Sequence, residues 1–205
     1  MKTRLLDKKG ITLIELMIAL VIAGILIGGV YKLFISQSKS YAVQEQVADT
    51  QQNIRGAMEI LLRDLRMAGY DDYKTAVSID NPIIAEQNAI TVIYERNNAQ
   101  CSVRYWLDSS RMMRQVTQNA VTITEPLLEN VEAFNVTYGV DYDASGKEDG
   151  SVDYWETSSA SLGSRKVIAV RITLTARANS VNPDTNSLSP RTLTSTVTFR
   201  NLTYR

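Results

Sequence analysis

The sequence KKGITLIELMIALVIAGILIGGVYKLFI, residues 8–35, is the most distinctive stretch of the chain. Between Ile11 and Tyr31 it holds 21 residues, and Glu15 is the only charged one among them. A helix of that length is about 31 Å long, which is enough to cross the hydrocarbon core of a bilayer. Because a carboxylate inside a membrane helix costs about 3 kcal/mol or less, depending on its depth, we expect Glu15 to have a specific partner.

Residues 1–10, MKTRLLDKKG, form a short leader with four basic residues and one acidic residue. Basic flanks of a membrane helix stay in the cytoplasm, so the leader predicts that the bulk of the chain lies across the inner membrane, in the periplasm. A secretory signal peptide is one alternative, but its apolar run is shorter and ends at a small-residue cleavage site. A plain membrane anchor is another alternative, which fits the length but explains neither Glu15 nor the Gly10–Ile11 junction.

The segment KKG-ITLIE resembles the class III signal of type IV prepilins. The resemblance implies that a membrane-embedded prepilin peptidase cuts between Gly10 and Ile11 and methylates the new terminus, so that Glu15 becomes the fifth residue of the mature chain. An amine freed at Ile11 is cationic near neutral pH, and Glu15 follows it by one helical turn. A carboxylate in the first turn also suits the helix dipole. The resemblance implies that, in a filament, Glu15 meets the amine of a neighbouring subunit.

The helix is predicted to continue beyond the apolar run as an amphipathic segment. Apolar residues recur there at helical spacing, at Val43, Val47, Ile54, Met58, Leu61, Leu65 and Ala68. This pattern predicts one helix from Ile11 to Ala68, with Gly69 as its stop. The apolar stripe needs a cover, for which we expect the downstream domain; a coiled coil is the alternative, although the repeat is short.

Downstream of Tyr70 the apolar period becomes two, which is typical of antiparallel strands with one solvated face. The pattern predicts strands at 89–95, 101–107, 112–116, 134–138, 168–176 and 193–199, with polar turns at Arg96–Gln100 and Asp108–Arg111. A helix laid across such a sheet is an α+β fold, here a pilin-like one. The predicted organisation is a leader at 1–10, a transmembrane or filament-core helix at 11–35, its amphipathic second half at 36–69 and a β-rich domain at 70–205.

Three further segments are similar to PilW-type minor pilins. They are RDLRMAGY (63–70) at the end of the helix, and LLENVEAFNVTYGV (127–140) and TFRNL (198–202) in the predicted sheet. The resemblance implies a structural subunit that helps to initiate or cap type IV pilus assembly. Its partners would be other pilin subunits through the N-terminal helix, the prepilin peptidase, and the inner membrane before assembly. The alternatives are a J-like pseudopilin of type II secretion and a calcium-dependent adhesin at a pilus tip.

Residues 141–153, DYDASGKEDGSVD, suggest a cation loop. Oxygen ligands at alternate positions around a glycine are typical of calcium loops, and the candidate ligands are Asp141, Asp143, Ser145, Asp149 and Asp153. The pattern departs from an EF-hand because position 12 is Val152 and no helices flank it. A polar hairpin loop is the alternative, since Asp, Ser and Gly favour turns.

Composition argues against other classes of function. The chain has no histidine, so the commonest general base and metal ligand are missing, and Cys101 is the only cysteine, so no internal disulfide forms. We therefore expect no enzyme. Basic and acidic residues number 22 each, which argues against nucleic-acid binding through bulk positive charge.

Overall fold

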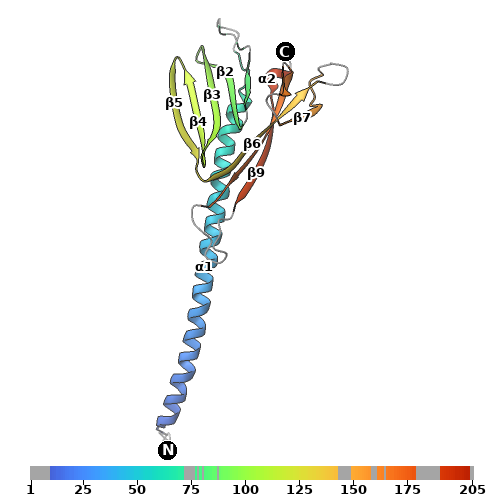
Figure 1. Ribbon diagram of the computed structural model, residues 1–205. Coiled ribbons are helices and arrows are strands. Elements are labelled where there is room, and N and C mark those ends of the chain that lie inside the picture. The colour runs from blue at the N-terminus through green and yellow to red at the C-terminus, as the bar shows by residue number, and fades with distance from the viewer. Residues whose placement is uncertain are drawn as a thin grey trace, which may run out of the picture. The chain divides into compact units, whose positions relative to one another are not determined.

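The computed structural model of the chain describes residues 10–71, 77, 79, 81–86, 88–142, 149–157, 161–163, 165–178 and 190–203. The chain divides into two compact units, Met1–Glu45 and Gln46–Arg205. Helix α1, Leu13–Arg66, contributes residues to both of them (Figure 1). The helix begins two residues later and ends two residues earlier than the sequence pattern predicts.

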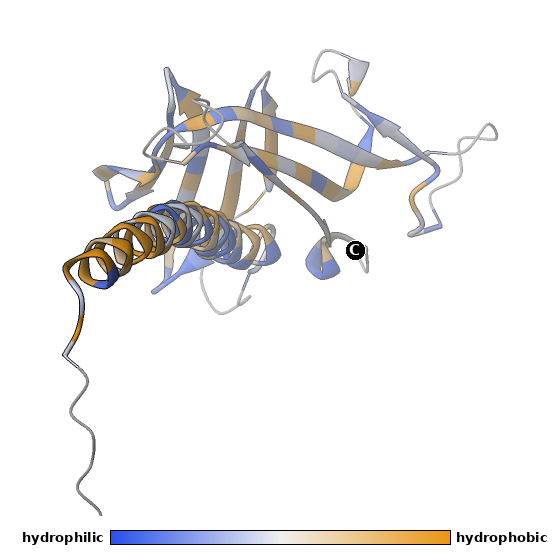
Figure 2. Ribbon diagram, turned by 90° about the horizontal axis from the view of Figure 1, so that it is seen from below, coloured by the Kyte–Doolittle hydropathy of each residue, from blue (hydrophilic) through white to orange (hydrophobic). Residues whose placement is uncertain are grey.

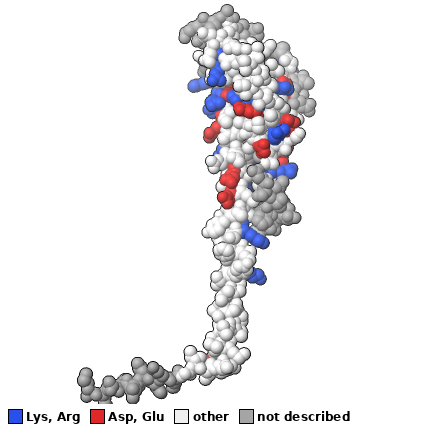
Figure 3. All heavy atoms as spheres, turned by 90° about the vertical axis from the view of Figure 1, so that its left-hand side faces the viewer, with Lys and Arg blue, Asp and Glu red and all other residues white. Residues whose placement is uncertain are grey.

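In the first unit, α1 exposes its apolar side chains on every face (Figure 2). Its most apolar 18-residue window has a mean hydropathy of 2.6, and no residue of that window is buried. Figure 3 shows the same segment as an almost uncharged surface. Within the described residues, α1 is the one helix whose length and composition would let it cross a membrane. Soluble monomers rarely expose so large an apolar surface, so lipid or other chains must cover it.

In the second unit, α1 buries one face against the strands. The buried residues follow helical spacing and comprise Thr50, Ile54, Ala57, Met58, Leu61, Asp64 and Leu65. Most of them belong to the same hydrophobic core as strand residues such as Val103 and Phe134. The prediction that the downstream domain covers this stripe is therefore confirmed. The helix is followed by Gly69 at φ 70°, a left-handed conformation that glycine adopts without strain, and its amide donates to Ile93 O at 2.9 Å.

Sheet A is an antiparallel meander in the order β1-β2-β3-β4-β5. The strands are β1 Ile83–Glu86, β2 Ala89–Arg96, β3 Ala99–Asp108, β4 Arg111–Gln118 and β5 Val121–Leu128. Asn97 and Asn98, and likewise Asn119 and Ala120, have positive φ angles, as expected for two-residue hairpin turns of type I′. Cys101 lies on β3 and is fully buried, where the sequence predicts a half-buried residue.

Sheet B has four antiparallel strands in the order β7-β6-β8-β9. They are β6 Val131–Asp141, β7 Tyr154–Glu156, β8 Lys166–Ala176 and β9 Arg191–Thr198, and the short helix α2, Arg200–Thr203, follows them. Gly139 on β6 is tightly enclosed, because a Cβ there would lie 3.0 Å from Ala169 Cβ and from Val152 Cγ2. The side chain of Asn201 donates to Ala68 O at 3.1 Å and so joins α2 to the end of α1.

The predicted α+β fold is confirmed, and the six predicted strands correspond to β2, β3, β4, β6, β8 and β9. Two details of the prediction are wrong. The strands form two sheets rather than one, and strands β1, β5 and β7 were not predicted.

Candidate functional site at the start of the N-terminal helix

Thr12 and Glu15 form a reciprocal cap at the start of α1. The Thr12 backbone amide donates to Glu15 Oε2 at 2.9 Å, and the Thr12 hydroxyl donates to the same oxygen at 2.8 Å. In return, the Glu15 amide donates to Thr12 Oγ1 at 3.3 Å. This is a capping box, in which two amides that lack an intrahelical partner are satisfied by side chains. The cap explains why the helix begins at Leu13 rather than at Ile11.

The capping box satisfies hydrogen bonds of Glu15 but does not neutralise its charge. Within the described residues, the carboxylate contacts neutral groups of Thr12 only. The positive end of the helix dipole compensates a carboxylate in this position only partly. Glu15 therefore still lacks a cationic partner in the described part of the chain.

The other two predicted processing residues lie directly before this cap. Gly10 and Ile11 precede the helix and have no regular secondary structure, and Ile11 is 79% exposed. Nothing would lie within 4 Å of a Cβ atom at Gly10. The structure thus brings Gly10, Ile11 and Glu15 together in one accessible segment, whereas residues 1–9 of the predicted leader lie outside the described residues.

The predicted cation loop falls partly outside the described residues, which exclude Asp143 and Ser145. Asp141 is buried and accepts the amides of Asp149 and Gly150 at 3.0 and 2.9 Å. Asp153 accepts the amide of Tyr142 at 2.7 Å. No group of three or more carboxylate, thiol or imidazole side chains in the described residues is placed to hold a metal ion. Calcium binding stays a prediction, which melting curves with calcium and with a chelator would test.

A buried charge cluster at the end of α1 was not identified from the sequence. Asp64 Oδ2 accepts a hydrogen bond from the Tyr105 hydroxyl at 2.6 Å and from Arg114 Nη2 at 2.8 Å. Arg114 also reaches Glu125 Oε1 at 3.2 Å, across the β4–β5 pair. Asp64 lies in the RDLRMAGY segment, which the sequence alone presents as an ordinary charged helix end. The signal that could have found it is spacing, because Asp64 follows Leu61 by three residues on the apolar face.

Burial and the neighbouring charges perturb this cluster strongly. Burial raises the pKa of Tyr105 far above its ordinary value near 10, and the negative charge of Asp64 raises it further. Burial alone would lower the pKa of Arg114, but its hydrogen bonds to Asp64 and Tyr105 raise it above the usual value. The cluster is thus an ion pair with a neutral tyrosine, which fixes α1 against β3 and β4.

Two family models match the chain. The prokaryotic N-terminal methylation motif matches residues 6–31, which include Gly10, Ile11, Thr12 and Glu15. The model for type IV pilus-assembly protein W, PilW, matches residues 92–202, more than half of the chain. The chain belongs to the PilW family.

A solved structure shares the fold of this PilW-family chain. A type IV-like pilin from Thermus thermophilus is similar with a TM-score of 0.50 and 12% sequence identity, over 74% of this chain and 97% of the other. At this identity the similarity shows the fold alone. Comparison with curated proteins gave no match. The family and the fold are those of structural subunits rather than enzymes.

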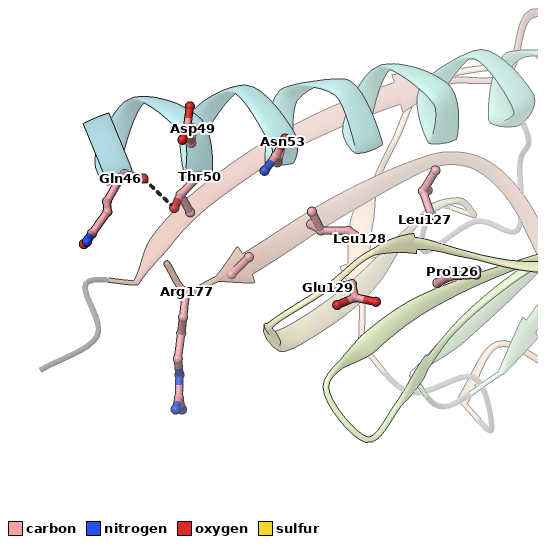
Figure 4. Close-up of a pocket in the computed structure, with 10 residues that line it drawn as sticks. Gln46, Asp49, Thr50, Asn53, Pro126, Leu127, Leu128, Glu129 and Arg177 are labelled. Atoms are coloured by element: carbon pink, nitrogen blue, oxygen red, sulfur yellow. Dashed lines mark hydrogen bonds between the residues drawn. The ribbon is translucent and has the colours of Figure 1, made fainter. Parts of the chain in front are cut away.

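The PilW-family chain also has an open groove of about 500 Å³ within its second unit (Figure 4). Helix α1 contributes one wall, and the end of β5 with the following turn contributes another, so that the lining comprises Gln46, Asp49, Thr50, Asn53, Pro126, Leu127, Leu128, Glu129, Ala176 and Arg177. Arg177 is paired with Glu132. Because the lining mixes both charges with apolar groups, the groove indicates no single ligand class.

Proposed function

We propose that this chain is a minor subunit of a type IV pilus, which is cut between Gly10 and Ile11, methylated at Ile11 and then built into a filament. The methylation motif at residues 6–31 and membership of the PilW family support this proposal. In the proposal, residues 1–10 are removed, 11–35 enter the filament core, 36–69 continue the helix and 70–205 form the subunit-specific domain. A subunit of this kind would help to initiate or cap assembly.

The carboxylate of Glu15 carries the proposal. It is bonded to neutral groups of Thr12 and lies beside a fully exposed apolar helix surface. An amine freed at Ile11 of an adjoining subunit would supply the missing positive charge, and neighbouring apolar helices would replace lipid. The basic leader supports an orientation in which the leader is cytoplasmic and the β-rich unit is periplasmic before assembly.

Mass spectrometry of the N-terminus of the chain from cells tests the processing step. We expect a mature chain that begins at N-methylated Ile11. An intact Met1, or a cut downstream of the apolar run, would contradict the proposal.

The assembly step is tested with Glu15→Gln, which removes the charge but keeps a side chain able to cap the helix. We expect filament incorporation to fall at least about tenfold, while cleavage after Gly10 continues, because the intersubunit ion pair is lost. Glu45→Gln is the matched control, since Glu45 is an exposed acid on the same helix. Equal incorporation of the two variants, measured by immunoblot of sheared filaments, would exclude the proposed role of Glu15.

A further inference from the structure

Strand β5 is the outermost strand of sheet A and pairs with β4 alone (Figure 1). The first six residues of β5, from Val121 to Pro126, are all exposed. Figure 3 views the molecule from the side on which β5 lies in Figure 1. In the described part of the chain, this strand therefore presents a free edge to solvent.

The register of the hairpin determines which backbone groups point outward. Asn119 and Ala120 form the two-residue turn, and Gln118 faces Val121 as the closing pair. The closing pair of such a hairpin is hydrogen-bonded, and bonded pairs alternate along an antiparallel ladder. Val121, Ile123 and Glu125 thus bond to β4, whereas the N–H and C=O groups of Thr122 and Thr124 point away from the sheet.

The side chains of β5 form one apolar row and one threonine row. Ile123 ends a ladder that crosses all five strands through Ile83, Val92, Val103, Val116 and Ile123. Val103 is fully buried, but Ile123 is 60% and Val121 is 62% exposed, the highest values for large apolar residues described after Glu45. The core-facing surface of the sheet thus continues onto β5 without a cover.

The usual protections of a sheet edge are missing from β5 between Val121 and Glu125. Natural edges are commonly short, charged, bulged or covered by another element. Edge strands β1 and β7 have four and three residues, and β9 adjoins helix residues such as Ile54 in a shared pocket. By contrast, β5 has no lysine or bulge in this range, and its one charge, Glu125, is bonded to Arg114. Pro126 lacks an N–H and so limits pairing to the residues before it.

We propose that β5 is an interface for a second copy of this chain, in which the two β5 strands pair antiparallel about a two-fold axis at Ile123. In this register Thr122 of each copy faces Thr124 of the other, so all the outward N–H and C=O groups of both residues are satisfied. The two Ile123 side chains meet in a non-hydrogen-bonded pair, where side chains approach most closely. This pairing extends sheet A across the two copies and does not depend on filament assembly.

The composition of β5 favours a second copy over an unrelated strand. The two-fold arrangement places apolar residues opposite apolar residues and puts no like charges opposite each other, since Glu125 faces Val121. Threonine pairs of the same kind already occur within the chain, at 3.0 Å between Thr173 and Thr194 and at 2.8 Å between Thr175 and Thr192. Cross-strand threonine pairs of this kind stabilise a sheet.

Cysteine cross-linking of the full chain in detergent micelles tests the register. Ile123→Cys places two thiols in direct apposition across the axis, with Cα atoms about 4.5 Å apart. Thr122→Cys is the matched control, because its two copies would lie roughly 8 Å apart, beyond the reach of a disulfide. After mild oxidation we expect at least about tenfold more disulfide-linked dimer from Ile123→Cys than from Thr122→Cys. The membrane helix is identical in both variants, so its own association affects both alike.

A second variant separates edge pairing from chance collision. Thr124→Pro removes an outward N–H and leaves the bonds to β4 intact. Combined with Ile123→Cys, it should reduce the dimer yield at least about fivefold by removing two of the four intermolecular hydrogen bonds. In the Thr124→Pro single variant, continued protection of buried Cys101 from alkylation would show that the fold is kept. Equal dimer yields from the two cysteine variants, no dimer from Ile123→Cys, or a mixed disulfide with a different protein would each overturn the proposal.

Discussion

Glu15 and Asp64 lie on the same helix, yet different kinds of group compensate their carboxylates. Glu15 bonds to neutral atoms of Thr12, three residues away, in a segment whose apolar side chains are all exposed. Asp64 is buried and bonds to the Arg114 guanidinium and the Tyr105 hydroxyl, which come from distant strands. The second half of α1 is therefore complete within its own domain, whereas the first half is complete only in its local cap. The charge and the apolar surface of the first half are left for partners outside the chain.

Asp64→Ala should give the largest effect and would test whether the second half is self-sufficient. The substitution leaves the Arg114 guanidinium, 15% exposed, without its buried partner. Breaking a buried ion pair in this way costs about 3–5 kcal/mol of unfolding free energy. Denaturant unfolding of the full chain in micelles, followed by tryptophan fluorescence, measures it. Asp49→Ala, at an exposed acid of the same helix, should stay within about 0.5 kcal/mol of wild type. A similar small change for Asp64→Ala would remove the distinction between the two carboxylates.

Alkaline pH should act on the Asp64 cluster with an intermediate effect. Because the pKa of Tyr105 is raised in the folded chain, the unfolded tyrosine releases its proton first as the pH rises above 10. The contribution of Tyr105 to stability is therefore fully present below pH 10 and is lost above it, by about 1.4 kcal/mol per pH unit. Tyr105→Phe should flatten this part of the stability curve, measured by unfolding from pH 8 to pH 11. An unchanged slope would show that Tyr105 is not held neutral by the cluster.

Thr12→Ala should have the smallest effect and would sharpen the description of the first half. Loss of the cap destabilises the first turn of α1 by about 1 kcal/mol. Hydrogen exchange of the Glu15 amide should then be about fivefold faster, because this amide donates to the Thr12 hydroxyl. Thr12→Ser keeps the hydroxyl and serves as the control. If the two variants exchange at the same rate, the capping box does not hold the helix start.

Periodicity in the sequence was sufficient to predict the helix, its buried face and most strands. The seven-residue recurrence of Ile54 and Leu61 predicted a covered stripe, and the structure covers it. Strand β5 was missed because Pro126 weakens a strand pattern, although proline is compatible with an edge position. The division into two sheets was missed because alternation shows which residues are buried but not which strands pair.

The candidate sites differ in how much of them is local in sequence. Gly10, Thr12 and Glu15 lie within six residues of one another, so a short motif contains the whole arrangement. The Asp64 cluster joins residues that are 41 and 50 positions apart, and no single-sequence pattern links them. Spacing on the helix does place Asp64 on the buried face, but the identity of its partners required the register of β3 and β4.

The order of synthesis gives the sheet A meander a further consequence. The ribosome makes the stripe that carries Ile54 and Leu61 before any strand that covers it, and Asp64 is made 50 residues before Arg114. A nascent α1 therefore exposes apolar surface along its full length, with both acids still unpaired. Hairpins β2–β3 and β3–β4 close through two-residue loops, and such short-range contacts form quickly. We expect closure of these hairpins to be the event that first makes the two halves of the helix different.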